Sequence, residues 1–164
     1  TMETLLFILL IGVAATAAMD AWSLARKTLL GLPAPDFALV GRWLGHMPRG
    51  RFRHHRIAEA TPIASERALG WAAHYLIGVL FAAVLVGLGG PAWLARPTLG
   101  LALAVGIATV AAPFLVMQPG MGAGLAARRT PRPWLARRQS LLNHAVFGLG
   151  LYGGAWVAQW VIGG

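Results

Sequence analysis

The chain has 164 residues, of which 57% are hydrophobic and only 12% are charged, and its mean hydropathy is +0.64. A soluble domain carries about 25% charged residues, so this composition excludes an ordinary soluble enzyme and favours a membrane protein. The sequence contains no cysteine, which excludes a disulfide framework and thiolate chemistry.

Four apolar segments are long enough to cross the hydrocarbon core of a bilayer, which takes about 20 residues of helix. They are continuously apolar, unlike the short alternating segments of an outer-membrane barrel. The sequence therefore predicts an all-α membrane protein, a compact bundle of four transmembrane helices that forms one domain over residues 1–164. The predicted spans are 4–25, 68–89, 97–119 and 139–162.

The Lys and Arg residues are concentrated in the loops 26–67 and 120–138. Eight of the fourteen lie between Arg26 and Arg67, and five more lie between Arg128 and Arg138. Because such residues collect in short cytoplasmic loops, both loops are expected in the cytoplasm and both termini in the periplasm. The net charge of +9 is then explained by the cytoplasmic placement of the two loops. It indicates anionic lipid headgroups rather than nucleic acid as the partner.

The first loop contains "PDFALVGRWLGHM", in which Asp36 can cap a following helix. Phe37, Val40 and Trp43 recur at helical spacing, which predicts a short helix lying in the membrane interface. The next segment, "PRGRFRHHR", sets His54 and His55 among arginines that would repel a cation, so no cation site is expected there. The side chains expected to contact lipid headgroups are Arg42, Arg49, Arg51, Arg53 and Arg56.

Three ionisable residues within the spans lie at one depth on three helices. Asp20, His74 and His144 are six or seven residues from the nearest flanking arginine, roughly 9–10 Å at 1.5 Å per residue. A lone carboxylate in hydrocarbon is costly, so Asp20 is expected to turn inward toward one of the histidines. The predicted ligand-binding set is Asp20, His74, Gln118, Asn143 and His144.

The third span is expected to be kinked or broken. Thr98 to Ala127 would be roughly 45 Å long as a continuous helix, more than a bilayer needs. Pro113 and Pro119 can kink it, and "PGMGAG" can unwind it. The freed carbonyls would add acceptors near Gln118, whereas the alternative is that the glycines only let helices pack closely.

Two segments suggest an internal repeat, because "RALGWAAHYLIG" and "RRQSLLNHAVFG" share the spacing R-x6-H-x3-G. The longer strings "GRWLGHMPRGRFRHHRIAEATPIASERALGWAAHYLIG", "QPGMGAGLAARRTP" and "SLLNHAVFGLGLY" resemble a family of small bacterial inner-membrane proteins known only as a domain of unknown function. The resemblance implies four spans and a bacterial inner membrane, and it implies no activity or cofactor.

Three classes of function fit these residues. The first is an integral inner-membrane protein with a buried polar pocket that binds a metal ion or small ligand. Asp20, His74 and His144 would suit a divalent first-row metal. Nearby Met residues suggest copper, and two histidines at one depth make haem the weaker alternative. The second is proton or solute transport by an oligomer, for example a homodimer. The third is a non-catalytic accessory or assembly subunit. No nucleophile or phosphate-loop motif marks a soluble-type hydrolase, whereas catalysis within the membrane by a metal-bound water stays open.

Overall fold

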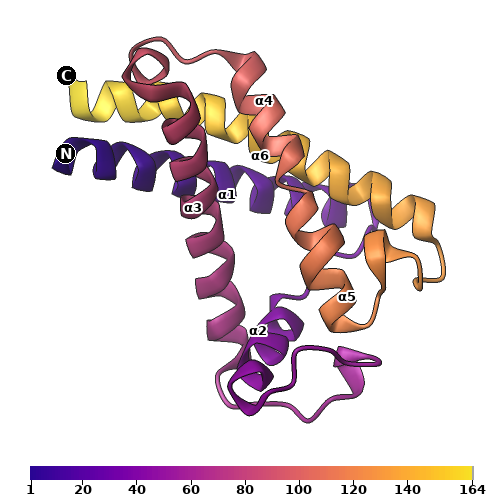
Figure 1. Ribbon diagram of the computed structural model, residues 1–164. Helices are drawn as coiled ribbons and strands as arrows, with labels where there is room; N and C mark the ends of the chain where they lie inside the picture. Colours follow the sequence, from indigo (N-terminus) through magenta and orange to yellow (C-terminus); the bar gives the residue numbers. More distant parts are fainter. Residues whose placement is uncertain (164) are drawn as a thin grey trace. The chain divides into compact units, whose positions relative to one another are not determined.

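The computed structural model describes residues 1–163, and these residues form helices and turns without a strand (Figure 1). This confirms the predicted all-α fold. The long helices are α1 (Met2–Leu30), α3 (Glu66–Ala95) and α6 (Pro133–Gly163). The shorter ones are α2 (Phe37–His46), α4 (Leu99–Ala108) and α5 (Gln118–Met121). Single turns complete the chain at η1 (Met47–Arg49), η2 (Ile57–Glu59), η3 (Pro113–Met117) and η4 (Leu125–Ala127).

Four helical stretches are long and apolar enough to cross a membrane, as predicted: Met2–Leu30, Glu66–Ala95, Leu99–Met121 and Pro133–Ile162. In each stretch, only 22–33% of the residues in an apolar 18-residue segment are buried within the protein. Large apolar side chains such as Leu76, Leu80 and Leu88 of α3 are more than half exposed. A soluble protein rarely exposes so much contiguous apolar surface, so these helices are suited to lipid.

The third span is interrupted, which confirms the predicted break. Helix α4 ends at Ala108, and a π-helical turn begins at Pro113 before the short α5. Proline lacks the N–H that would continue the helical ladder, and π-helical turns, which are rare, occur mostly as single turns within an α-helical stretch. The chain leaves α5 through Gly122, which has a positive φ of 98°. Helix α3 has a comparable kink at Gly90.

The contacts within the chain define two compact units. Unit 1 comprises Thr1–Ala34, Tyr75–Thr109 and residues 141–163, whereas unit 2 comprises Pro35–His74 and Val110–Ser140. Unit 1 therefore contains most of the apolar helices. Unit 2 contains α2, α5, the first turns of α3 and the two basic loops.

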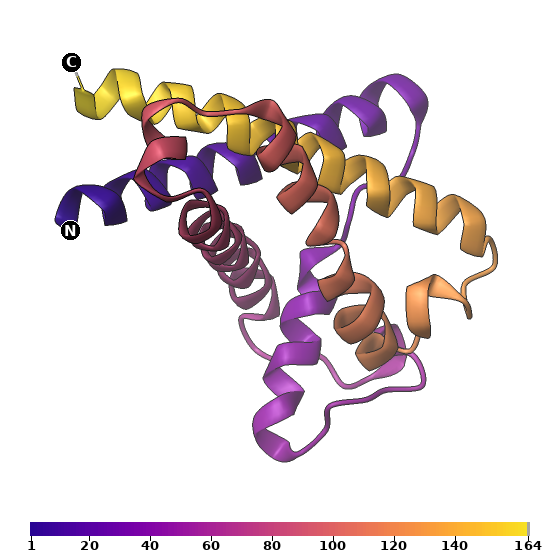
Figure 2. The same cartoon turned by 45° about the horizontal axis from the view of Figure 1, so that its top comes forward.

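Unit 1 is held together by close helix contacts at small residues. A Cβ atom at Gly78 of α3 would lie 2.0 Å from the Thr16 hydroxyl of α1, and one at Gly106 of α4 would lie 2.4 Å from Gly148 Cα of α6. Helices α1 and α6 are antiparallel, with the two chain ends on the same side (Figures 1 and 2). Their core combines small side chains such as Ala15 with larger ones such as Ile11, Phe147 and Leu151.

Unit 2 is built around α2, whose predicted N-cap is confirmed because the Asp36 carboxylate accepts a hydrogen bond from the Ala38 N–H at 3.0 Å. Helix α2 packs on the start of α3 where Gly41 meets Gly70, so closely that a Cβ on either would overlap backbone atoms of the other helix. Trp43 is buried against Gly120 and donates its indole N–H to the Phe52 carbonyl at 2.9 Å. The predicted short helix thus exists, with one face packed inside unit 2.

Candidate functional site

Asp20 is paired within unit 1. The Tyr75 hydroxyl of α3 donates a hydrogen bond to Asp20 Oδ2 of α1 at 2.9 Å. A hydrogen bond to a carboxylate stabilises more than one between neutral groups, because the acceptor carries the charge. The carboxylate is thus held on the side of α1 that meets α3, as expected for an acidic group that cannot face hydrocarbon.

His144 is also held within unit 1. Its Nδ1 lies 2.8 Å from the Thr109 hydroxyl, and that hydroxyl lies 2.6 Å from the Gly106 carbonyl. Since the carbonyl can only accept, the Thr109 hydrogen points to Gly106, and Thr109 then accepts from His144 Nδ1–H. This arrangement leaves Nε2 of the neutral imidazole as the lone-pair nitrogen.

Two further residues of the predicted set, His74 and Gln118, belong to unit 2. The His74 ring stacks on Phe37 with ring centroids 4.0 Å apart, and it lies edge-on to Trp71. Gln118 begins α5, and its side-chain Oε1 is buried without a hydrogen-bond partner. The layer that would join Asp20, His74 and His144 spans both units, and it stays a prediction.

Metal binding by this layer gains no support from the structure. Within residues 1–163, no three His, Asp or Glu side chains form a group that could hold a metal ion. A stable transition-metal site normally uses three or four protein ligands, so the argument for a copper or other divalent ion at Asp20, His74 and His144 rests on sequence depth alone.

Unit 1 contains a second set of buried polar atoms, which sequence reasoning missed in part. The Trp22 indole nitrogen, Arg26 Nε and Asn143 Oδ1 are buried, and none has a hydrogen-bond partner in the described part of the chain. Arg26 is only 5% exposed, and its guanidinium lies 5.7 Å from the centroid of the Trp22 ring. Of these residues the sequence pointed only to Asn143.

The packing of α1 on α6 indicates that Trp22 and Asn143 lie at one level. Gly150 packs on Ala15 and Gly154 on Ile11, so each step along α1 corresponds to one step back along α6. Counting seven residues onward from Ala15 and seven back from Gly150 gives Trp22 and Asn143. Seven residues are about two helical turns, so both also lie on the facing sides of the two helices. Arg26 follows Trp22 by one turn on the same face.

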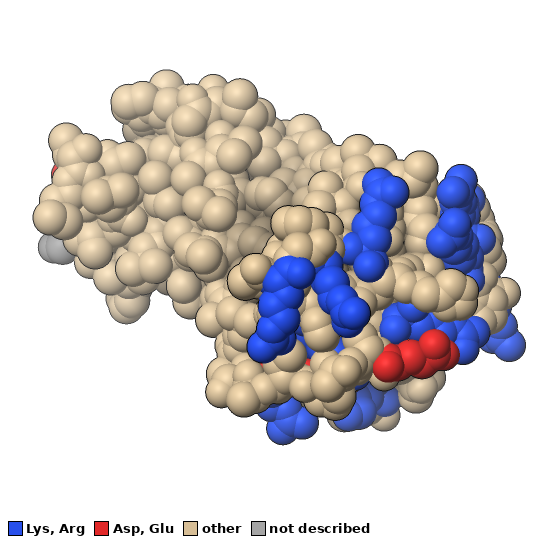
Figure 3. Space-filling view, turned by 60° about the horizontal axis from the view of Figure 1, so that its bottom comes forward, with Lys and Arg blue, Asp and Glu red and all other residues tan. Residues whose placement is uncertain are grey.

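Most of the Lys and Arg residues belong to unit 2, and Figure 3 shows basic side chains gathered over part of the surface in view. Six of them belong to the first segment of unit 2 and five to its second segment. Arg49, Arg51, Arg53 and Arg56 are exposed, although Arg56 pairs with Glu59 at 3.0 Å. Contact between these four arginines and lipid headgroups remains a prediction.

Arg42 differs from those arginines because its guanidinium is committed to acceptors within unit 2. It donates two hydrogen bonds to the Glu66 carboxylate, at 2.8 and 2.9 Å, and others to the carbonyls of Ala58 and Ala60. The hydrogen bonds to Glu66 raise the pKa of Arg42 above its ordinary value. Both side chains are less than 20% exposed, so the pair ties α2 to the start of α3.

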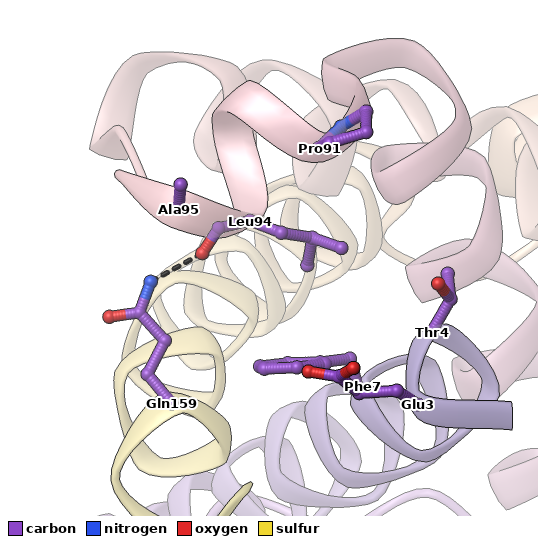
Figure 4. A pocket seen from close by; sticks show the side chains of 7 residues that line it. All are labelled: Glu3, Thr4, Phe7, Pro91, Leu94, Ala95 and Gln159. Carbon is purple, nitrogen blue, oxygen red and sulfur yellow. Dashed lines mark hydrogen bonds between the residues drawn. The ribbon is translucent and has the colours of Figure 1, made fainter. Parts of the chain in front are cut away.

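An open pocket of about 520 Å³ lies at the other end of unit 1, near the chain termini (Figure 4). Apolar side chains such as Phe7 and Leu94 line much of it, and Gln159 donates to the Leu94 carbonyl across its edge. The pocket brings together few groups that could bind or react with a ligand. The polar atoms of Trp22, Arg26 and Asn143 therefore make the better candidate site.

Comparison with known proteins adds the family but no activity. No curated protein and no solved structure matches this chain. A family described as "Protein of unknown function (DUF2938)" matches residues 9–158, which is nearly the whole chain. With four helices suited to a bilayer and a match of this length, the protein is a small membrane protein that belongs to the DUF2938 family.

Proposed function

We propose that this membrane protein binds a ligand with an anionic group through Trp22 and Arg26 of α1 and Asn143 of α6. The observation that carries the proposal is the set of three buried polar atoms without a partner. A buried polar group left unsatisfied costs about 1–3 kcal/mol, and a charged group costs more. Three such groups on facing sides of two helices are explained most simply by a ligand that pairs with them.

The chemistry of the three groups defines the ligand. An indole N–H and a guanidinium only donate hydrogen bonds, so they need acceptor oxygens. Arg26 has no acidic partner among the described residues, because the ion pairs there involve only Arg42 and Arg56. The amide oxygen of Asn143 needs a donor. The ligand therefore combines a phosphate or carboxylate with a hydroxyl or amine group.

Such a group can come from a lipid or from a small soluble anion. Arg26 lies near the end of α1, which ends at Leu30, so its guanidinium is within reach of the headgroup region. The distribution of Lys and Arg favours the cytoplasmic side of a bacterial inner membrane for this end of α1. Phosphatidylglycerol offers a phosphate and two hydroxyls and carries a net negative charge, so it is a lipid that fits all three groups.

Arg26→Gln is expected to weaken phosphatidylglycerol binding by about tenfold or more, because a hydrogen bond to a charged group contributes about 1.5–3 kcal/mol. The measurement is native mass spectrometry of protein from nanodiscs of phosphatidylcholine with increasing phosphatidylglycerol. Lys27→Gln is the matched control, since it removes the same charge from an exposed neighbouring position. It should bind as the wild type does.

Inorganic phosphate added to pure phosphatidylcholine nanodiscs separates the two sources of the anion. Binding of phosphate that depends on Arg26 would identify a soluble anion as the ligand. Equal retention of phosphatidylglycerol by the wild type, Arg26→Gln and Lys27→Gln, with no Arg26-dependent phosphate binding, would refute the proposal.

A further inference from the structure

We propose that the pocket near the chain termini binds the headgroup of an ethanolamine phospholipid, with the lipid ammonium at Glu3. The lining comes from the start of α1, the end of α3 and the last turns of α6, all within unit 1 (Figure 4). This pocket lies at the opposite end of unit 1 from Trp22 and Arg26, and it would bind a group of opposite charge. Either proposal can therefore fail without the other.

A break in α3 sets off the turn that forms one side of the pocket. Gly90 has a φ of 64° and a ψ of −169°, so the chain leaves the helical path there and Pro91–Ala95 follows as a separate turn. Pro91 has no N–H with which to restore the helical ladder. Pro91 and Leu94 of this turn and Phe7 of α1 are the apolar part of the lining. The volume of about 520 Å³ is in the range of small-molecule sites, roughly 300–1,000 Å³.

The polar part of the lining favours a positively charged donor. Glu3 has no ion-pair partner in the described part of the chain, where the ion pairs involve only Arg42 and Arg56. The Gln159 amide N–H donates to the Leu94 carbonyl, which leaves Gln159 Oε1 as an acceptor. A carboxylate and an amide oxygen together suit a primary ammonium group, which has three N–H donors and a positive charge.

The surroundings of Glu3 match the other parts of a phospholipid. Helix α1 has 29 residues, about 43 Å at 1.5 Å per residue, so its ends extend beyond the roughly 30 Å hydrocarbon core to the level of headgroups. Phe7 follows Glu3 by one turn on the same face, and its ring can attract a cation. Arg96, the one basic residue outside the two basic loops, directly follows Ala95 of the lining and is exposed. Ethanolamine phospholipids combine an ammonium group for Glu3, a phosphate for Arg96 and hydrocarbon for the apolar wall.

The test is native mass spectrometry of the full-length protein released from nanodiscs with equal amounts of phosphatidylethanolamine and phosphatidylcholine of identical acyl chains. The wild type is expected to retain phosphatidylethanolamine in preference, because the choline nitrogen has no N–H to donate. The N-monomethyl and N,N-dimethyl derivatives should fall between the two lipids, in the order of their remaining N–H groups.

Glu3→Gln is expected to reduce this preference by about tenfold or more, the fold-change that corresponds to losing a hydrogen bond to a charged group. Glu59→Gln is the matched control, since it removes an exposed carboxylate from unit 2 and should leave the preference unchanged. Arg96→Gln should reduce retention by at most about fivefold, because an exposed ion pair contributes little. Arg26→Gln, which tests the anion site, should have no effect here.

Ala95→Trp tests the pocket without removing a charge. Ala95 is an exposed lining residue, so an added indole can occupy the pocket without displacing the core. This variant should lose the preference, whereas Ala104→Trp, at an exposed position of α4 outside the lining, should keep it. Equal retention of the two lipids by the wild type would overturn the proposal. A preference that persists in both Glu3→Gln and Ala95→Trp would also overturn it, because the lipid would then bind elsewhere.

Discussion

Gly70→Ala is expected to destabilise the protein by about 1–3 kcal/mol or more, the usual cost of forcing atoms into a packed interior. A Cβ at residue 70 would lie 1.7 Å from the Phe37 carbonyl oxygen and 2.6 Å from its carbon. Both are backbone atoms at the start of α2, so they cannot rotate away as the end of a side chain can. The contact can be relieved only by separating α2 from α3.

Gly87→Ala is the matched control, because Gly87 lies in the same helix and a Cβ there would meet nothing within 4 Å. Alanine is favoured over glycine in a helix by about 0.5–1 kcal/mol, so this variant should be neutral or more stable. The measurement is unfolding of both variants in mixed micelles with increasing SDS. Equal stability of Gly70→Ala and Gly87→Ala would contradict the close packing of α2 on α3.

Tyr75→Phe is expected to lower the free energy of unfolding by about 1.5–3 kcal/mol, the range for a hydrogen bond to a charged group. The substitution removes only the hydroxyl that donates to Asp20 Oδ2. Asp20→Asn keeps an acceptor oxygen and should cost less, because the hydrogen bond survives without the charge. Asp20→Ala removes the acceptor, so a further Tyr75→Phe change should then have little effect.

The wild type, Tyr75→Phe, Asp20→Ala and the double variant form a double-mutant cycle. Comparing their free energies of unfolding in SDS isolates the contribution of the Tyr75–Asp20 pair. Tyr152→Phe is the control, since Tyr152 is the other tyrosine of the chain and packs edge-on against Trp156. It should change stability by less than about 0.5 kcal/mol. Additive losses from Tyr75→Phe and Asp20→Ala would show that the two side chains act independently, contrary to the structure.

The secondary structure could be predicted from sequence because its causes are local. Hydropathy over twenty residues locates each span, the Asp36 side chain caps the turn that follows it, and Pro113 interrupts the third span whatever surrounds it. The pairing of polar side chains is not local. His74 and Tyr75 differ in depth by only about 1.5 Å, yet they point about 100° apart around the helix. Depth alone could not identify Tyr75 as a donor to Asp20.

The candidate anion site was hard to predict for a different reason. Trp and Arg at the end of a span are ordinary interface residues, so Trp22 and Arg26 carry no distinctive signal in the sequence. They become candidates for a binding site only through their burial and through the register between α1 and α6. That register follows from the packing of Gly150 and Gly154 on α1. Asn143 was the one member of the set that could be selected from the sequence, as a polar residue within a span.

The most direct test of the anion site observes the Trp22 indole N–H itself. The seven tryptophans can be labelled with ¹⁵N, and the Trp22 resonance is assigned by its loss in Trp22→Phe. When phosphatidylglycerol replaces phosphatidylcholine in nanodiscs, or when phosphate is added, the Trp22 resonance should move downfield as the N–H gains an anionic acceptor. Trp160, which is 82% exposed near the other end of unit 1, should not move. The shift should disappear in Arg26→Gln, and a Trp22 resonance that responds to neither phosphatidylglycerol nor phosphate would contradict the proposed function.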